Sequence, residues 1–351
     1  MRPSARLPRH GSACPSCGWT GHSRSNCSRM PPRASRAAWG RWPMASKDAR
    51  IEVIATAVSG SIADWGKVQR IEPLFREAGW TNLRLTAIEG HREARARAAE
   101  LVRDGARILI SAGGSGTFNA VLAGILDAEP PLAEIRLGFL RKGSADLIGK
   151  VLGMPDEIEA AVRVFSEAIA ADRTEPCDLL RVEAPGTGLP VKHFVGYGGA
   201  GLFGRIPHFT ENRFMKWYKG VLGQLFGDLG PFTTGMSLAV GERVLKAPFT
   251  KRRHWRLTVD GAEAASGRFQ ALILVNGYLG PQLAYSEDTL GSGRFHCYAL
   301  RDRGGFSLLR QAAAARSGAI RRDPARWGME HYAATKTLEI ACDQPFPLTV
   351  E

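Results

Sequence analysis

The sequence predicts two folded domains, an α/β domain with a mostly parallel sheet and, after it, a domain built as an antiparallel β-sandwich. The first prediction rests on residues 44–180, where β-prone runs alternate with segments of helical spacing. The second rests on residues 181–351, where short β-prone runs follow one another with glycine and proline turns between them. The chain of 351 residues is 44% hydrophobic, which is enough to bury two cores, and no apolar run is long enough to predict a spanning helix.

Strands and helices are expected to alternate through the first domain. Residues 65–78 have the spacing of a helix, because Val68, Ile71, Leu74 and Phe75 fall on one face. The other expected helices span 92–103 and 118–126, and the expected strands span 50–58, 83–88, 107–111 and 137–140. Repeated strand–helix units of this kind predict parallel strands with helices on both faces of the sheet.

The expected strands of the second domain span 177–182, 191–195, 236–240, 254–259, 269–275, 294–300 and 337–342. Residues 214–226 have the pattern of an amphipathic helix, for which a membrane surface and core packing are both open interpretations. The basic run 251–253 is either a contact for anionic lipid headgroups or a solvated turn. His193, His208 and His331 lack the spacing of a metal or base site and are interpreted as structural.

A glycine-rich loop follows the expected strand 107–111 and opens the next helix. It consists of Gly113, Gly114, Ser115, Gly116 and Thr117. Such a loop suits phosphate, because glycine allows close approach of the backbone and the N–H groups at a helix start face the anion. The hydroxyl of Thr117 is expected to cap the helix or to bond a phosphate oxygen. A tight turn with glycines needed only for packing is the alternative.

Residues 1–43 differ from the rest of the chain. They hold eight arginines and no acidic residue, so they carry +8 of the net charge of +13. Cys14, Cys17, His22 and Cys27 have the spacing C-x2-C-x4-H-x4-C, which suits a tetrahedral Zn²⁺ and resembles a zinc knuckle that binds single-stranded nucleic acid. Two other interpretations remain open: an organelle leader, or upstream sequence before a natural start at Met44.

Several segments together resemble the catalytic domain of the diacylglycerol kinase family, which includes bacterial lipid kinases, sphingosine kinases and ceramide kinases, with NAD kinases as distant relatives. Residues 108–126 resemble the family's GGDGT nucleotide loop. The other matching segments, in chain order, are 58–60, 138–146, 152–155, Asn276-Gly277 and Gly293. The resemblance extends from about residue 50 to the end of the chain.

This resemblance implies an ATP-dependent kinase that transfers the γ-phosphate to a lipid hydroxyl of the diacylglycerol type, with Mg²⁺ bridging the phosphates. The residues it assigns to the nucleotide are Ser59, Gly60, Gly113, Gly114, Ser115, Gly116, Thr117, Arg141, Lys142, Gly143, Ser144 and Asp146. Glu351 takes the place of the acid in the family's D-G-E motif, which acts as base on the lipid hydroxyl. Because the family continues beyond this motif, the second domain is expected to be incomplete at residue 351.

Arg141-Lys142 replace the family's Pro-x pair, and these two cations are suited to neutralise the charge of a triphosphate. Three other departures keep a second function open: Ser115 stands where the family has an acid, Leu147 stands where it has an Asp, and the sequence ends at the position of the D-G-E motif. The alternative is therefore a nucleotide- or lipid-binding homologue without kinase activity. The expected partners are a lipid substrate and a peripheral membrane surface. The few scattered cysteines of the body indicate a reduced, cytoplasmic location.

Overall fold

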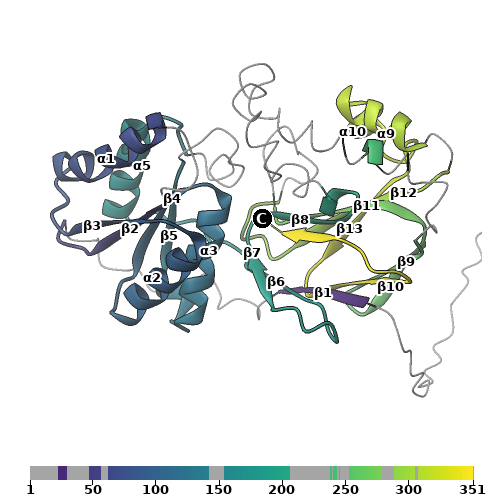
Figure 1. Ribbon diagram of the computed structural model, residues 1–351, viewed down its shortest axis with the longest axis horizontal. Helices are drawn as coiled ribbons and strands as arrows, with labels where there is room; N and C mark the ends of the chain where they lie inside the picture. Colours follow the sequence, from purple (N-terminus) through teal and green to yellow (C-terminus); the bar gives the residue numbers. More distant parts are fainter. Residues whose placement is uncertain are drawn as a thin grey trace, which may run out of the picture.

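The computed structural model places an α/β domain beside a β-sandwich along the long axis of the molecule (Figure 1). It describes residues 23–29, 47–56, 62–141, 154–205, 238, 240–242, 245, 253–277, 288–304 and 307–350. The expected fold class is confirmed: the first domain has a parallel sheet with helices on both faces, and the second has two antiparallel sheets.

Four parallel strands form the sheet of the first domain, in the order β3-β2-β4-β5. Their bounds are Leu83–Ile88 for β3, Ile51–Thr56 for β2, Ile108–Gly113 for β4 and Arg136–Arg141 for β5. Strand β2 is buried along its whole length. A strand in the middle of a parallel sheet is covered on both faces, and this explains its nearly continuous run of apolar residues.

Helices cover the two faces of this sheet in pairs. Helices α1 (Ile62–Glu77) and α5 (Ile158–Ala170) enclose one core, and α2 (His91–Arg103) and α3 (Ser115–Asp127) enclose the other. A Cβ atom on Gly124 of α3 would overlap the carbonyl oxygen of Arg95 in α2. Glycine at this position therefore lets the two helices approach each other closely.

The bounds predicted from the sequence lie within a few residues of those in the structure, but some elements were not predicted. Helix α5 and the short 3₁₀ helix η2 (Leu132–Glu134) were not expected. In α5, the buried side chains Ile158, Ala161 and Val162 fall three and four residues apart, which is the pattern of an amphipathic helix.

The second domain consists of two sheets. The six-stranded sheet has the order β10-β9-β14-β1-β6-β7, and the five-stranded sheet has the order β13-β12-β11-β8-β15. The strands of the first are Ala262–Gly267 (β10), Trp255–Val259 (β9), Thr337–Cys342 (β14), Ser23–Arg29 (β1), Leu180–Glu183 (β6) and Lys192–Phe194 (β7). The strands of the second are Met329–Ala334 (β13), Phe295–Arg301 (β12), Phe269–Val275 (β11), Tyr197–Gly201 (β8) and Leu348–Val350 (β15).

Apolar side chains from both sheets form one core, with Trp255, Phe295 and Leu338 fully buried in it. Helices α9 (Ser307–Arg316) and α10 (Ala319–Arg322) cover the outer face of the five-stranded sheet, together with the 3₁₀ helix η3 (Phe203–Arg205). This arrangement is visible at the upper right of Figure 1.

One expected strand of the second domain is wrong. Within 236–240, the described residues Leu238 and Val240 are helical. Val240 is buried against Phe203 and Leu308. A short apolar run does not by itself distinguish a strand from one face of a helix, because both present apolar residues at close spacing. The strands β8, β10 and β13 and the helices α9 and α10 were not expected.

Part of the basic head belongs to the second domain. Strand β1 lies between β14 and β6 and is antiparallel to both, with Cys27 opposite Leu338 and Val182. Cys27, one of the four predicted Zn²⁺ ligands, lies in this strand, and the zinc site stays a prediction. Cys14, Cys17 and His22 lie outside the described residues.

The two domains are joined by a small apolar cluster. Phe118 and Leu122 of α3 and Phe139 of β5 pack with Val195, which follows β7. The rings of Phe118 and Phe139 meet edge to face, with their centroids 5.3 Å apart. Helix α3 therefore belongs to both the first domain and the joint to the second.

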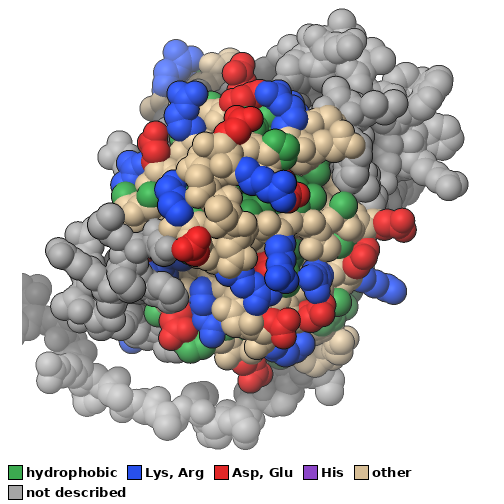
Figure 2. All heavy atoms as spheres, turned by 90° about the vertical axis from the view of Figure 1, so that its left-hand side faces the viewer, with side chains coloured by type: hydrophobic (Ala, Val, Ile, Leu, Met, Phe, Trp, Pro, Cys, Tyr) green, Lys and Arg blue, Asp and Glu red, His purple; other side chains and the backbone are tan. Residues whose placement is uncertain are grey.

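The outer side of the first domain carries charges of both signs, with Lys and Arg interspersed among Asp and Glu (Figure 2). Charged side chains of the first domain also form ion pairs, and Arg95 donates two hydrogen bonds to Asp127 with N–O distances of 2.6 and 2.8 Å. In the part of the chain that the structure describes, no helix is long and apolar enough to cross a membrane.

Candidate functional site

The ends of the four parallel strands mark the candidate site. Strands β2, β3, β4 and β5 end at Thr56, Ile88, Gly113 and Arg141, and parallel strands bring these ends to the same edge of the sheet. Helices α2 and α3 begin at this edge, directly after β3 and β4. In open α/β sheets, ligands bind at the carboxyl edge.

The expected glycine loop connects β4 to α3 without any intervening turn. Gly114 is the N-cap of α3 in an extended conformation, and its carbonyl oxygen accepts hydrogen bonds from the N–H groups of Thr117 and Phe118 at 3.0 and 3.1 Å. No side chain caps this helix. The expected cap from Thr117 is therefore wrong. The start of a helix favours an anion, because the helix dipole is positive at this end.

The hydroxyl of Thr117 bonds to a neighbouring strand instead. Its Oγ1 lies 2.8 Å from Oγ1 of Thr56 at the end of β2, and both residues are fully buried. A Cβ atom on Gly113 would lie 2.5 Å from Oγ1 of Thr117 and 2.9 Å from Oγ1 of Thr56. Gly113 is therefore required for the packing that joins β2 to the start of α3.

The other assigned nucleotide residues are placed only in part. Arg141 ends β5, and its backbone pairs with that of Gly113, so the strand that precedes Lys142 lies beside the loop. Ser59, Gly60, Lys142, Gly143, Ser144 and Asp146 lie outside the described residues. Ser59 and Gly60 follow β2 in the sequence, and residues 142–146 follow β5. Both strands end at the candidate site.

A histidine that the sequence did not single out also lies at this edge. His91 is the first residue of α2, and its ring lies against Gly116 of the loop. The two residues are distant in the sequence, and only the packing of α2 on α3 brings them together. No local pattern around His91 indicated this contact.

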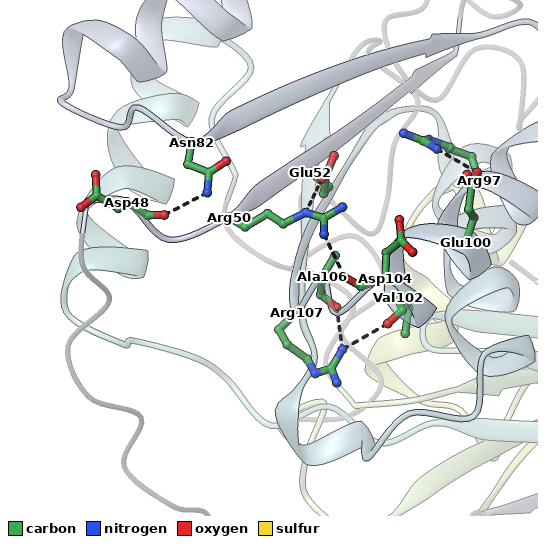
Figure 3. Close-up of polar contacts among 10 residues, drawn as sticks. All are labelled: Asp48, Arg50, Glu52, Asn82, Arg97, Glu100, Val102, Asp104, Ala106 and Arg107. Atoms are coloured by element: carbon green, nitrogen blue, oxygen red, sulfur yellow. Dashed lines mark hydrogen bonds and ion pairs between the residues drawn. The ribbon is translucent and has the colours of Figure 1, made fainter.

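The opposite edge of the sheet has polar contacts of a different kind. The guanidinium group of Arg50 lies between Glu52 and the backbone of Asp104 (Figure 3). Its Nε–H donates to Oε1 of Glu52 at 2.6 Å, and its Nη1–H donates to the carbonyl oxygen of Asp104 at 2.9 Å. Nearby, Nη1–H of Arg107 donates to two carbonyl oxygens at 3.1 and 3.2 Å. These bonds join the strand starts to α2, so this edge is structural.

Asn276 and Gly293, two residues of the family resemblance, lie where the two domains meet and form hydrogen bonds there. Asn276 is fully buried, and its Nδ2–H groups donate to the carbonyl oxygens of Asp178 and Val195 at 2.7 and 2.9 Å. The N–H of Gly293 donates to Oδ2 of Asp178 at 2.8 Å. These residues therefore fix the segment that leaves the first domain against the end of β11.

Strand β8 contains three glycines, Gly198, Gly199 and Gly201, and strand β15 near the end of the chain pairs with it. Val350 of β15 lies opposite Gly198, and a Cβ atom on Gly198 would lie 2.9 Å from the carbonyl oxygen of Thr349. Glycine in β8 thus allows β15 to pack closely. Glu351, the assigned base, follows β15 directly and lies outside the described residues.

Three polar residues are linked at the start of β12. Nε2 of His296 lies 2.9 Å from Oδ2 of Asp288, and Nδ1 of His296 lies 2.9 Å from Nε2 of His331. Burial and the neighbouring His296 lower the pKa of His331, and Asp288 opposes this shift. These contacts hold residues 288–294 against the sheet, which agrees with the structural interpretation of His331. The described residues contain no group of three or more His, Cys, Asp and Glu that is suited to a metal ion.

A family comparison decides what kind of domain carries the glycine loop. Residues 50–182 match the model of the diacylglycerol kinase catalytic domain. This segment is therefore similar to the diacylglycerol kinase catalytic domain. The match contains all four parallel strands and the loop, so the resemblance seen in the sequence is confirmed for the first domain.

Solved structures support the same fold over most of the chain. A crystal structure of a Bacillus anthracis protein assigned to the diacylglycerol kinases has a TM-score of 0.60 and 15% identity, and the alignment covers 87% of this chain and 96% of that one. A second crystal structure of a diacylglycerol kinase from this organism has a TM-score of 0.56 and 15% identity, with the same coverage. A search of curated proteins found no match to this sequence.

Proposed function

We propose that the chain is an ATP-dependent lipid kinase that transfers the γ-phosphate of ATP to a hydroxyl group of a diacylglycerol-like lipid. The observation that carries the proposal is the glycine loop at the carboxyl edge of the sheet, within a diacylglycerol kinase catalytic domain. The loop forms the start of α3, where the helix dipole favours an anion, and its backbone is held in place by the buried bond between Thr56 and Thr117.

The residues at this edge fit the phosphates of a nucleotide. Gly116 is exposed, and Gly114 has no side chain, so a phosphate oxygen can reach the backbone N–H groups at the start of α3. Arg141 and Lys142 add positive charge where β5 ends. Ser59, Gly60, Gly143, Ser144 and Asp146 complete the proposed nucleotide site, because they follow the same strand ends.

Bound with the nucleotide, Mg²⁺ supplies positive charge to the β- and γ-phosphates. Ser115 offers a hydroxyl where the family has an acid, and the described residues lack a carboxylate cluster that would cage the ion. Mg²⁺ commonly takes most of its ligands from phosphate oxygens and water.

Glu351 is the proposed base. Its carboxylate accepts the proton of the lipid hydroxyl as the hydroxyl oxygen forms a bond to the γ-phosphorus. The bond from that phosphorus to the β–γ bridging oxygen breaks, and ADP leaves with this electron pair. Residues 251–253 are proposed to attract an anionic membrane surface that presents the lipid. Within them, Nε–H of Arg253 also donates to the carbonyl oxygen of Pro345 at 3.2 Å.

The test uses vesicles that contain diacylglycerol, with radiolabelled ATP as donor. We expect labelled lipid from the wild-type chain, and none from Gly114→Val, because the valine side chain blocks approach to the backbone. Glu351→Gln should lower turnover by about 100-fold or more while ATP still binds. Gly66→Ala is the matched control, because a Cβ atom at this position in α1 has no neighbour within 4 Å.

The result with Gly114→Val decides whether the loop holds the nucleotide. Labelled lipid at the wild-type rate in this variant would refute the loop assignment. Unchanged turnover in Glu351→Gln would refute the assignment of the base and leave the nucleotide site in place.

Ser115 favours a second candidate, a nucleotide-binding homologue without kinase activity. A hydroxyl cannot provide the charge that an acid offers to Mg²⁺. Calorimetric binding of ATP without labelled lipid would support this candidate over the kinase. Ser115→Asp would then be expected to produce turnover if this residue alone is the cause. Turnover by the wild-type chain would exclude the second candidate.

A further inference from the structure

The imidazole ring of His91 lies over the glycine loop. A Cβ atom on Gly116 would lie 2.9 Å from Cε1 and 3.0 Å from Nε2 of His91. The ring edge that bears Nε2 therefore contacts the backbone of the loop. Gly116 and His91 are both exposed, so a molecule that reaches the loop from solvent also meets this ring.

The fold itself does not require this imidazole. No side chain caps α2, whose N-cap is Gly90, and Glu93 instead accepts a hydrogen bond from the N–H of Glu89 at 2.8 Å. Among the described residues, no hydrogen bond or ion pair involves the His91 ring. Its nitrogen atoms are therefore able to bond a ligand.

His91 and the end of β5 lie on opposite sides of the loop. Strand β4 leads into the loop, and β5, which ends at Arg141, is its neighbour on one side. On the other side lie β2 and then β3, and His91 begins the helix that follows β3. A bound triphosphate would lie between them. An N–H donor on this second side is useful, because a hydrogen bond to a charged phosphate is stronger than one between neutral groups.

We infer that His91 is a further nucleotide-binding residue, whose Nε2–H donates to a phosphate oxygen of the nucleotide on the glycine loop. The inference rests on the proposed function. The competing explanation is that the ring only shields the backbone of Gly116. The two differ in what they require: a phosphate contact needs an N–H donor, and shielding needs only a flat ring.

Calorimetry with ATP and adenosine distinguishes them, using the full chain, three variants of His91 and Gly66→Ala as control. We expect His91→Ala and His91→Phe each to weaken ATP binding by about tenfold or more, the size of a lost charge-assisted hydrogen bond. His91→Arg keeps a donor and should stay within about threefold of the wild type. Adenosine has no phosphate, so its affinity should be the same in all of them.

Each outcome has a distinct meaning. Wild-type affinity for ATP in His91→Phe overturns the inference and shows that the ring acts only as a cover. An equal loss of affinity for adenosine also overturns it, because the effect would then not involve the phosphates. If the wild-type chain binds no ATP, the proposed function fails as well. Thermal unfolding of the variants should match the wild type, because His91 is exposed and unbonded within the described residues.

Discussion

Replacing Gly113 with alanine tests whether the loop is held by packing against β2. The added methyl group would lie 2.5 Å from Oγ1 of Thr117, 2.8 Å from its Cβ, and 2.9 Å from Oγ1 of Thr56. Both threonines are fully buried, so neither side chain can move aside into solvent. The substitution therefore has to push α3 away from β2 or separate the two hydroxyl groups.

The expected cost has two parts. Overpacking of a filled core costs about 1–3 kcal/mol. Loss of the hydrogen bond between Thr56 and Thr117 adds about 1 kcal/mol. We therefore expect Gly113→Ala to lower the free energy of unfolding of the first domain by about 2–4 kcal/mol. ATP binding should weaken too, because the start of α3 is displaced.

Urea denaturation followed by circular dichroism measures the stability, and calorimetry measures the affinity for ATP. The control is Gly66→Ala, the same substitution in the exposed part of α1, which should stabilise the chain by about 0.5–1 kcal/mol through helix propensity. A second test combines Gly113→Ala with Thr56→Val. The two changes share one contact, so their effects should not add.

Two results would refute this reasoning. One is a Gly113→Ala chain whose free energy of unfolding stays within about 0.5 kcal/mol of the wild type, which is the range of a neutral surface change. The other is strict additivity with Thr56→Val, which would mean that the alanine methyl does not act through the threonine pair.

Three further predictions concern the rest of the fold. Gly124→Ala should destabilise the first domain by about 1–3 kcal/mol in urea denaturation, because its methyl group would overlap the carbonyl of Arg95 in α2; a neutral effect would show that the helices can separate freely. For Asp260, desolvation raises the pKa of the carboxyl group. Hydrogen bonds from three N–H groups and one hydroxyl of residues 335–337 lower it by more, so that the pKa falls to about 2. Its stabilising contribution is therefore complete above pH 3.8 and is lost as the pH falls towards 2, and because the carboxylate is exposed we expect it to be only about 1 kcal/mol. Melting curves between pH 2 and 5 should show a shallower pH dependence for Asp260→Asn than for the wild type, and equal slopes would contradict the assignment. Asn276→Leu removes both donors to the joint between the domains and should cost about 2–3 kcal/mol; a second transition in scanning calorimetry would indicate separate unfolding of the domains, whereas an unchanged thermogram would contradict the role of Asn276.

The strands and helices of the first domain could be predicted from the sequence because their patterns are local. Strand β2 is an apolar run, and helix α1 has apolar residues on one face, and each pattern lies within a single element. The glycine loop was visible for the same reason, since its glycines, its strand and its helix are contiguous. The family resemblance also followed from contiguous residues.

The errors have a common cause. Residues 236–240 are a short β-prone run, but Val240 is helical and packs on Phe203 and Leu308, residues far away in the chain. Strand β1 looked like part of a polar head, yet it pairs with β14 and β6 through its backbone. Backbone pairing depends little on side-chain type, so a polar composition did not reveal this strand.

For this protein, the sequence by itself determined the alternation of elements, the phosphate-type loop and the family of the first domain. The tertiary structure alone decided which side chains surround the loop. Thr117 was expected to face a helix end or a phosphate, and it bonds Thr56 at the end of another strand. His91 had no local pattern to distinguish it, and it lies on Gly116. Contacts between distant segments depend on how the strands are ordered and how the helices pack, and neither is encoded in any short stretch of residues.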